Sequence, residues 1–256
     1  MIMGYASPFS LTGKVALVTG SRQGLGAAMA LALAEAGADV FCHGRHADPG
    51  DICDRIRQLG RQSIYIPGDV ADEAFCQDLM ARALTAFGRL DILINNAGTI
   101  RRAPAAEYAL ADWDAVISVN LRSIFQLSQL AARHMLVRGS GKIINIASLL
   151  SFQGGILVPA YAAAKGGVAQ LTKALANEWA VRGINVNALA PGYMETANTA
   201  ALRADPVRHR QILERIPAGR WGRPEDVAGA AVFLSSAAAD YIHGQVLAVD
   251  GGWLSR

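Results

Sequence analysis

Short apolar runs alternate with longer amphipathic segments along the whole chain. The amphipathic segments have helical spacing near residues 24–36, 51–59, 72–87, 112–138, 160–181 and 224–235. The apolar runs are rich in Val, Ile, Leu and Ala and predict seven strands: Val15–Thr19, Asp39–His43, Ser63–Pro67, Asp91–Asn95, Lys142–Ala147, Ile184–Ala190 and Gln245–Val249. Strands that alternate with helices favour βαβ crossovers. The predicted fold class is therefore α/β: a single-domain Rossmann fold with a doubly wound, seven-stranded parallel sheet and helices on both faces.

No repeat or linker divides the chain, so we expect one dinucleotide-binding catalytic domain over residues 1–256. In such a sheet, ligands bind outside the carboxyl ends of the strands. The stretch 193–223 contains no predicted strand, several arginines and two prolines. It predicts a lid or substrate-loop insertion.

Composition narrows the functional class. The net charge is +3, and no block of Lys and Arg suggests nucleic-acid binding. The three cysteines (Cys42, Cys53 and Cys76) have no metal-ligand spacing, and the five histidines include no HExxH motif, so we expect neither a disulfide framework nor a metal. No apolar run is long enough to span a membrane, and no signal peptide is evident. These features predict a cytoplasmic protein that binds small molecules.

The first strand runs into a glycine-rich turn. Thr19 is followed by Gly20, Gly24 and Gly26, and an Ala-rich helix begins there. Glycines let a turn bend sharply and approach a pyrophosphate, whose charge the helix N-terminus stabilises. An ordinary strand-to-helix turn is the alternative, because glycines alone are weak evidence. The position between a strand and a helix favours dinucleotide binding.

Tyr161 and Lys165 lie four residues apart on a predicted helix, so their side chains share one face. A free tyrosine has a pKa of about 10, and a nearby ammonium together with a positive nicotinamide can lower that pKa. Ser148 follows the fifth strand, and its hydroxyl can stabilise a developing alkoxide. Each residue alone could be a packing aromatic, a solvated lysine or a cap. Together they predict an enzyme that moves hydride between a nicotinamide and a secondary alcohol or ketone.

These motifs resemble the short-chain dehydrogenase/reductase family over nearly the whole chain. The further matching positions are Asp69, Asn95 to Gly98, Asn120, Pro191, Gly192 and Thr196. The resemblance implies that Asn120 acts with Ser148, Tyr161 and Lys165 by holding a water in a proton relay, that Asp69 contacts adenine and that Asn95 to Gly98 line the cofactor. It also implies that Thr196 touches the nicotinamide carboxamide. The complete set of expected cofactor residues is Gly20, Ser21, Arg22, Gln23, Gly24, Leu25, Gly26, Arg45, Asp69, Val70, Asn96, Ala97, Gly98, Tyr161, Lys165, Pro191, Gly192 and Thr196.

Several further segments resemble sugar-acid dehydrogenases of this family: Ile100–Arg102, Ser151–Gly155, Asn177–Ala180, Ala190–Met194, Arg215–Gly222 and Gly251–Leu254. We therefore expect a sugar-acid substrate that contacts Arg102, Ser148 and Tyr161. An arginine can bind a carboxylate through two parallel hydrogen bonds, although paired arginines are more often solvated. A 3-oxoacyl-thioester reductase, a polyol dehydrogenase and a non-catalytic dinucleotide sensor remain alternatives. The resemblance also implies a homotetramer, with helices near 112–138 and 160–181 at its interface.

The end of the second strand bears on the choice of cofactor. NAD-selective sites place an acid there to bind the ribose 2′-hydroxyl. Here the position is Gly44, followed by Arg45, while Asp39 lies at the other end of the strand. Arg45 could bind a 2′-phosphate, which favours NADP, although NAD stays open. The alternative is that Arg45 stacks on adenine or points to solvent.

Overall fold

All seven predicted strands are present and pair in parallel. The computed structural model describes residues 7–47 and 51–256. Its sheet has the order β3-β2-β1-β4-β5-β6-β7, and each pairing between neighbours is parallel. The strands are β1 (Val15–Val18), β2 (Asp39–Gly44), β3 (Ser63–Pro67), β4 (Ile92–Asn95), β5 (Gly141–Ile146), β6 (Ile184–Pro191) and β7 (Val246–Val249). The predicted Rossmann sheet is confirmed.

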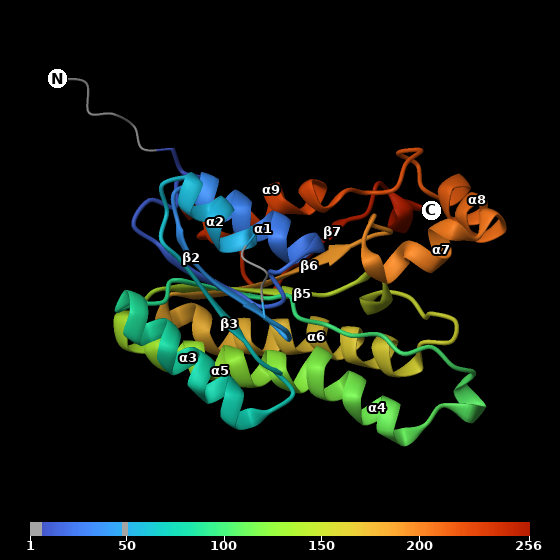
Figure 1. Cartoon of the computed structure of the whole chain (residues 1–256), viewed down its shortest axis with the longest axis horizontal. Helices are drawn as coiled ribbons and strands as arrows, with labels where there is room; N and C mark the ends of the chain where they lie inside the picture. Colours follow the sequence, from blue (N-terminus) through green and yellow to red (C-terminus); the bar gives the residue numbers. More distant parts are fainter. Residues whose placement is uncertain (1–6, 48–50) are drawn as a thin grey trace.

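Helices cover both faces of this sheet (Figure 1). One layer contains α1 (Gly24–Glu35), α2 (Asp51–Gln58) and α9 (Pro224–Ser235). The other contains α3 (Glu73–Phe87), α4 (Leu110–Ile117), α5 (Ser123–Arg138) and α6 (Pro159–Trp179). Two hydrophobic cores, one on each face, hold the layers together.

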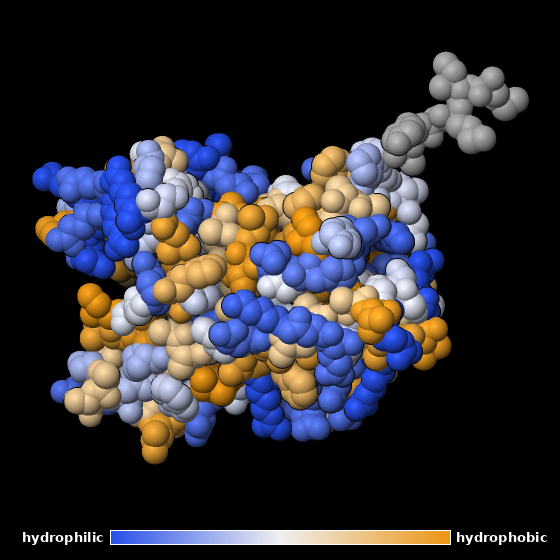
Figure 2. Space-filling view, turned by 180° about the vertical axis from the view of Figure 1, so that it is seen from behind, coloured by the Kyte–Doolittle hydropathy of each residue, from blue (hydrophilic) through white to orange (hydrophobic). Residues whose placement is uncertain are grey.

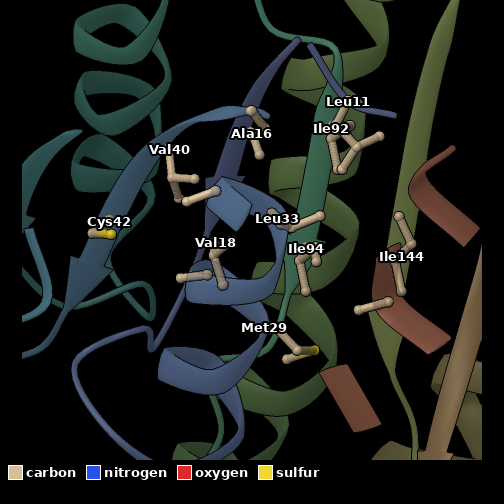
Figure 3. Packing of buried hydrophobic residues seen from close by; sticks show 14 of the residues in the cluster. Leu11, Ala16, Val18, Met29, Leu33, Val40, Cys42, Ile92, Ile94 and Ile144 are labelled. Carbon is tan, nitrogen blue, oxygen red and sulfur yellow. The ribbon is translucent and has the colours of Figure 1, made fainter. Parts of the chain in front are cut away.

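The strand sequences account for two cores, because successive side chains of a strand point to opposite faces. In β1, Ala16 and Val18 belong to the core under α1, whereas Leu17 belongs to the core of the other layer. Figure 3 shows strand side chains gathered around Met29 and Leu33 of α1. Complete burial on both faces fixes the register, since a shift by one residue would exchange the two faces.

The segment expected as one helix over residues 112–138 consists of two α-helices joined by a π-helical segment. It begins two residues earlier, at Leu110, and contains a π-helical segment, Ser118–Arg122, between α4 and α5. Such segments frequently occur at functional sites. Here the segment carries Asn120, whose side chain is completely buried.

The stretch 193–223 forms two helices, α7 (Ala200–Ala204) and α8 (Pro206–Arg215). Met194 and Gly222 form an isolated bridge, so the stretch contains no regular strand, as predicted. A separate apolar cluster that includes Ile212 of α8 and Trp253 attaches it to the rest of the fold. Seen from behind, α7 and α8 belong to a mostly hydrophilic lobe (Figure 2).

Two further observations concern the described residues. None of their helices is both long and apolar enough to cross a lipid bilayer. Cys42, Cys53 and Cys76 are buried and form no disulfide within this part of the chain.

Candidate active site

A cleft of about 680 Å³ opens at the carboxyl ends of the central strands. It lies where the chain order reverses beside β1, which is the usual binding position in an open α/β sheet. Its lining includes these residues expected to contact the cofactor: Gly20, Arg22, Gln23, Gly24, Leu25, Gly26, Arg45, Asn96, Ala97, Gly98, Tyr161, Lys165 and Thr196. The volume is in the range of cofactor sites.

The N-terminus of α1 faces this cleft without a side-chain cap. Gln23 precedes the helix in an extended conformation and makes no capping hydrogen bond. The first amides of the helix, beginning at Gly24, are therefore available to a phosphate. Gly26 cannot carry a side chain here, because a Cβ atom would lie 2.2 Å from the Gly20 carbonyl oxygen. The glycine spacing thus brings turn and helix into close contact at the phosphate position.

Asn96 holds the glycine turn in place from β4. Its side-chain amide donates to the carbonyl oxygens of Thr19 at 2.8 Å and Gly20 at 3.1 Å. In return, the Thr19 hydroxyl accepts hydrogen bonds from the backbone N–H groups of Asn96 and Ala97. The Asn-Asn-Ala-Gly motif therefore also has a structural role, as the brace of the phosphate turn.

His43, at the end of β2, is a second brace that the sequence did not reveal. Its Nδ1 accepts from the Gly20 N–H at 3.3 Å, and its Nε2 lies 3.1 Å from the Gly68 carbonyl oxygen. Both bonds form when the ring is neutral with its proton on Nε2. Ser21 turns toward the backbone of the same histidine with its N–H and its hydroxyl. Ser21 is therefore buried and does not line the cleft, and its expected contact with the cofactor stays a prediction.

At the end of β2, a side chain in place of Gly44 would have to displace Tyr65. A Cβ atom there would lie 2.2 Å from the Tyr65 hydroxyl and 3.4 Å from Cβ of Arg22. Arg22 and Arg45 both line this part of the cleft. Arg45 pairs with Asp69 at 3.2 Å, but both side chains are well exposed, so the pair is weak and can exchange partners.

Tyr161 and Lys165 project from α6 toward the end of β5. The Lys165 ammonium lies 5.6 Å from the centre of the Tyr161 ring and donates to the carbonyl oxygen of Ile146. Lys165 is only 3% exposed, and burial lowers the pKa of its ammonium to about 8. The expected pairing of tyrosine and lysine on one helix face is therefore present.

The Tyr161 hydroxyl has a polar environment on two sides. Burial raises its pKa, while a hydrogen bond with Ser148 and the positive charge of Arg102 oppose that shift. The lowered tyrosine pKa expected from the sequence is thus not found in the protein alone, because desolvation outweighs these two effects. Ser148, which also caps the turn after β5, is brought to the tyrosine as expected.

Asn120 contacts the loop after β4 from the π-helical segment. Its side chain accepts from the Thr99 N–H at 2.9 Å and donates to the Thr99 carbonyl oxygen at 2.7 Å. The side chain is thereby occupied in positioning the segment after Gly98. Its expected role in a water relay stays a prediction.

Several other expected contacts lie outside the cleft lining. Asn95 is buried in a polar chain with Ser128 and Asn145, so only the later part of its motif reaches the cleft. The remaining positions with expected cofactor roles that do not line the cleft are Asp69, Val70, Pro191 and Gly192. Val70 packs in the core, and Gly192 approaches Asp250 so closely that a Cβ atom would lie 2.6 Å from its Cα.

The second wall of the cleft, residues 193–223, and the strand ends include residues to which the sequence assigned no role. Ile146 and His46 line the strand ends, and Pro224 begins α9 at the rim. The segment after β6 contributes Glu195, Ala197, Asn198 and Arg203. Arg102 reaches this segment by donating to the Asn198 carbonyl oxygen at 3.2 Å, whereas Arg101 pairs with Asp112 at 3.5 Å. Arg102 therefore bridges the two walls.

A Rossmann cleft lined by Tyr161 and Lys165, with Ser148 near the tyrosine, defines a nicotinamide-dependent oxidoreductase, and the chain belongs to the short-chain dehydrogenase/reductase family. The family model described as enoyl-(acyl carrier protein) reductase matches residues 20–254. The 2-dehydro-3-deoxy-D-gluconate 5-dehydrogenase of Escherichia coli K12 is 53% identical, with 98% of this chain and 99% of the relative covered. That of Bacillus subtilis is 54% identical, with 99% and 100% covered. The structure of a gluconate 5-dehydrogenase from Burkholderia cenocepacia with NADP and tartrate has 42% identity and a TM-score of 0.94, covering 98% and 99% of the two chains.

Proposed function

We propose that the protein is an NADP-dependent 2-dehydro-3-deoxy-D-gluconate 5-dehydrogenase, which interconverts a secondary alcohol and a ketone on a sugar acid. The observation that carries this proposal is the position of Tyr161 and Lys165, four residues apart on α6, in the lining of a dinucleotide-sized cleft. Identities of 53% and 54% over nearly full length to enzymes with this activity support the substrate class.

Each reactive group has its own role in the transfer of hydride and proton. A bound nicotinamide supplies the hydride acceptor or donor. In the oxidative direction, Tyr161 as phenolate takes the proton of the substrate hydroxyl, and in reduction it returns that proton. The Ser148 hydroxyl binds the same substrate oxygen. Lys165, with its pKa of about 8, stabilises the phenolate by its charge and can exchange the proton near neutral pH.

Arg102 is the residue that we assign to the substrate carboxylate. Its charge acts on the Tyr161 hydroxyl, so its guanidinium lies within electrostatic reach of the reacting oxygen. Among the described residues no carboxylate pairs with Arg102, and its guanidinium donates to the Asn198 carbonyl oxygen. A planar fork with free donors can bind a carboxylate in two parallel hydrogen bonds.

The cofactor proposal rests on Gly44, Arg22 and Arg45. The absence of an acidic side chain at Gly44, with two arginines in the lining beside it, fits a 2′-phosphate better than a bare ribose hydroxyl. The gluconate 5-dehydrogenase structure with NADP agrees with this preference. Arg45→Ala should raise KM for NADP⁺ and leave KM for NAD⁺ nearly unchanged.

A substrate panel tests the proposal. The purified protein is incubated with NADP⁺ or NAD⁺ and with sugar acids, uncharged polyols or hydroxyacyl thioesters, while nicotinamide absorbance is followed. We expect the highest kcat/KM with NADP⁺ and a 3-deoxy sugar acid. A preference for polyols or acyl thioesters would replace the substrate assignment, and cofactor binding without turnover on any of them would indicate a dinucleotide sensor.

We also propose a cytoplasmic homotetramer. Leu110, Trp113, Phe125 and Val137 expose large apolar side chains on α4 and α5, the helices expected at an interface. Three buried cysteines that form no disulfide agree with a reducing compartment. Light scattering of the purified protein should give four times the mass of one chain, and a monomeric mass would reject this assembly.

A further inference from the structure

Arg203 of α7 is the one cation of the cleft lining to which neither the catalytic nor the specificity argument gives a role. The charged residues of the described lining are Arg22, Arg45, Lys165 and Arg203, with Glu195 as the single carboxylate. A cleft with four cations and one anion is suited to a ligand with several negative charges. Arg22 and Arg45 lie beside the end of β2, and Lys165 lies beside Tyr161. Arg203 is therefore the remaining cation, and no group of the ligand is yet assigned to its charge.

The contacts of Arg203 leave most of its donors unused. One terminal nitrogen, Nη2, donates to the Thr196 carbonyl oxygen at 3.3 Å. The Nε–H is buried and has no hydrogen-bond partner among the described residues. In that same part of the chain, no carboxylate lies within ion-pair distance of its guanidinium. Because a buried donor without a partner is costly, an anionic ligand that satisfies it would gain affinity.

The position of Arg203 indicates which anion this is. Thr196, whose carbonyl oxygen accepts from Arg203, lies close to the start of α1: a Cβ atom on Gly24 would be 3.8 Å from Cγ2 of Thr196. The uncapped N-terminus of α1 is the expected phosphate position. Arg203 and the first amides of α1 therefore lie near one region of the cleft, whereas Arg22 and Arg45 lie beside Gly44.

We propose that Arg203 binds the pyrophosphate of the dinucleotide, together with the first amides of α1, and thereby joins α7 to the bound cofactor. This inference rests on the proposed function only insofar as the cofactor is a dinucleotide. A planar guanidinium can form two parallel hydrogen bonds to phosphate oxygens, whereas an ammonium binds phosphate as a point charge without that fixed geometry. The contact is independent of the 2′-phosphate, so it serves NAD⁺ and NADP⁺ alike.

Binding measurements without substrate separate Arg203 from the other arginines. Dissociation constants are determined by calorimetry for NADP⁺, NAD⁺, ADP-ribose and adenosine 2′-monophosphate, using the wild type, Arg203→Met and Arg203→Lys. We expect Arg203→Met to weaken the three pyrophosphate ligands by a similar factor, about 10- to 100-fold. The monophosphate should be unaffected. Arg203→Lys should recover part of the loss. Arg210→Met removes an exposed arginine of α8 outside the cleft lining and should change none of the four constants.

Two other binding results would overturn the proposal. Unchanged dinucleotide constants with a raised KM for the sugar acid would place Arg203 on the substrate carboxylate. A loss confined to NADP⁺ and adenosine 2′-monophosphate would place it on the 2′-phosphate. If Arg203→Met lowers the melting temperature of the ligand-free protein, the dissociation constants and KM of Arg203→Lys are judged by the same criteria in its place. If the protein does not turn over the proposed substrate, these dissociation constants can still be measured and still test the role of Arg203. If the wild type binds no dinucleotide, both the proposed function and the role of Arg203 are wrong.

Discussion

The two walls of the cleft differ in how completely their polar groups are satisfied. The first wall consists of the glycine turn, Thr19–Gly26, and the start of the loop after β4. There Asn96 and Thr19 exchange hydrogen bonds in both directions, and His43 braces Gly20 from behind. Each of these contacts is made by the protein itself, so this wall is already shaped for a phosphate.

The second wall, residues 193–223, leaves buried polar atoms without protein partners. Arg203 Nε, His209 Nδ1 and Trp221 Nε1 account for three of the six such side-chain atoms in the described chain. The wall is held mainly by the apolar cluster around Ile212 and Trp253 rather than by hydrogen bonds to the sheet. The side chains of the first wall are therefore held by the protein itself, and its free donors are the backbone amides of α1. In the second wall a buried side-chain donor of the cleft lining, the Arg203 Nε–H, is left for a ligand. The lid expected over this stretch stays a prediction.

Tyr161→Phe should give the largest effect, because Tyr161 stands between the walls and transfers the proton. The substitution keeps the ring and removes the hydroxyl that bonds Ser148. Turnover should fall by about 10²- to 10⁴-fold. The dissociation constant of NADP⁺ should stay nearly unchanged, since the first wall is intact. Steady-state kinetics and calorimetry measure the two quantities. Wild-type turnover under conditions where chemistry limits the rate would exclude Tyr161 as the proton-transfer group.

Arg102→Ala should have the next largest effect and is selective for charged substrates. Loss of one member of a desolvated ion pair is worth about 2–5 kcal/mol, so kcat/KM for a sugar acid should fall at least about 30-fold. Uncharged polyols should lose far less. Arg101→Ala is the matched control, because Arg101 pairs with Asp112. Equal losses for acid and polyol would mean that Arg102 supports the second wall through Asn198 without binding the carboxylate.

Gly26→Ala tests whether the first wall is as rigid as its contacts indicate. The added Cβ would meet the Gly20 carbonyl oxygen at 2.2 Å, and a backbone atom cannot move aside cheaply. The free energy of unfolding should fall by about 1–3 kcal/mol, and NADP⁺ should bind more weakly. Gly229→Ala, in an exposed part of α9 with no atom within 4 Å, should stabilise the protein by about 0.5–1 kcal/mol. Denaturant titration of both variants compares them. If Gly26→Ala has the free energy of unfolding and the NADP⁺ affinity of the wild type, the turn can relax to accommodate the added Cβ atom.

The sequence was most informative where one short pattern decides the structure. Short runs of Val, Ile, Leu and Ala predicted the strands of both cores, and the four-residue spacing predicted the shared face of Tyr161 and Lys165. The sequence was less informative where consecutive residues of a motif point in different directions. The side chains of Ser21 and Asn95 belong to cofactor motifs but bond to His43 and Asn145 inside the protein.

The remaining site residues depend on contacts between distant parts of the chain. His43 bonds Gly20 and Gly68, which are 23 and 25 residues away in the sequence, so no local pattern distinguishes it from another strand residue. Arg203 is one of several arginines in a strandless stretch. Only its place beside Thr196, near the start of α1, separates it from exposed neighbours such as Arg210.

His43 provides the smallest and most specific test of the first wall, through pH. Its ring is 2% exposed, and burial lowers its pKa, partly offset by the Gly68 carbonyl oxygen and the charge of Asp69. The unfolded chain therefore takes up this proton at a higher pH than the folded protein does. The stability contributed by neutral His43 is present above pH about 6.5 and is lost as the pH falls below that value toward the folded pKa.

Within that window the free energy of unfolding should decline by up to about 1.4 kcal/mol per pH unit on account of His43 alone. His43→Asn keeps a hydrogen-bond acceptor near Gly20 but cannot titrate, so this variant should be less stable at neutral pH and show a shallower acid slope. His134 also has a pKa lowered by burial, and His134→Gln shows how much of the slope belongs to that residue. Protonated His43 can no longer accept from the Gly20 N–H, so NADP⁺ affinity should decline in the same pH window for the wild type. Denaturant titrations and calorimetry across this range measure both slopes. If His43→Asn reproduces them, the first wall does not depend on the charge state of His43.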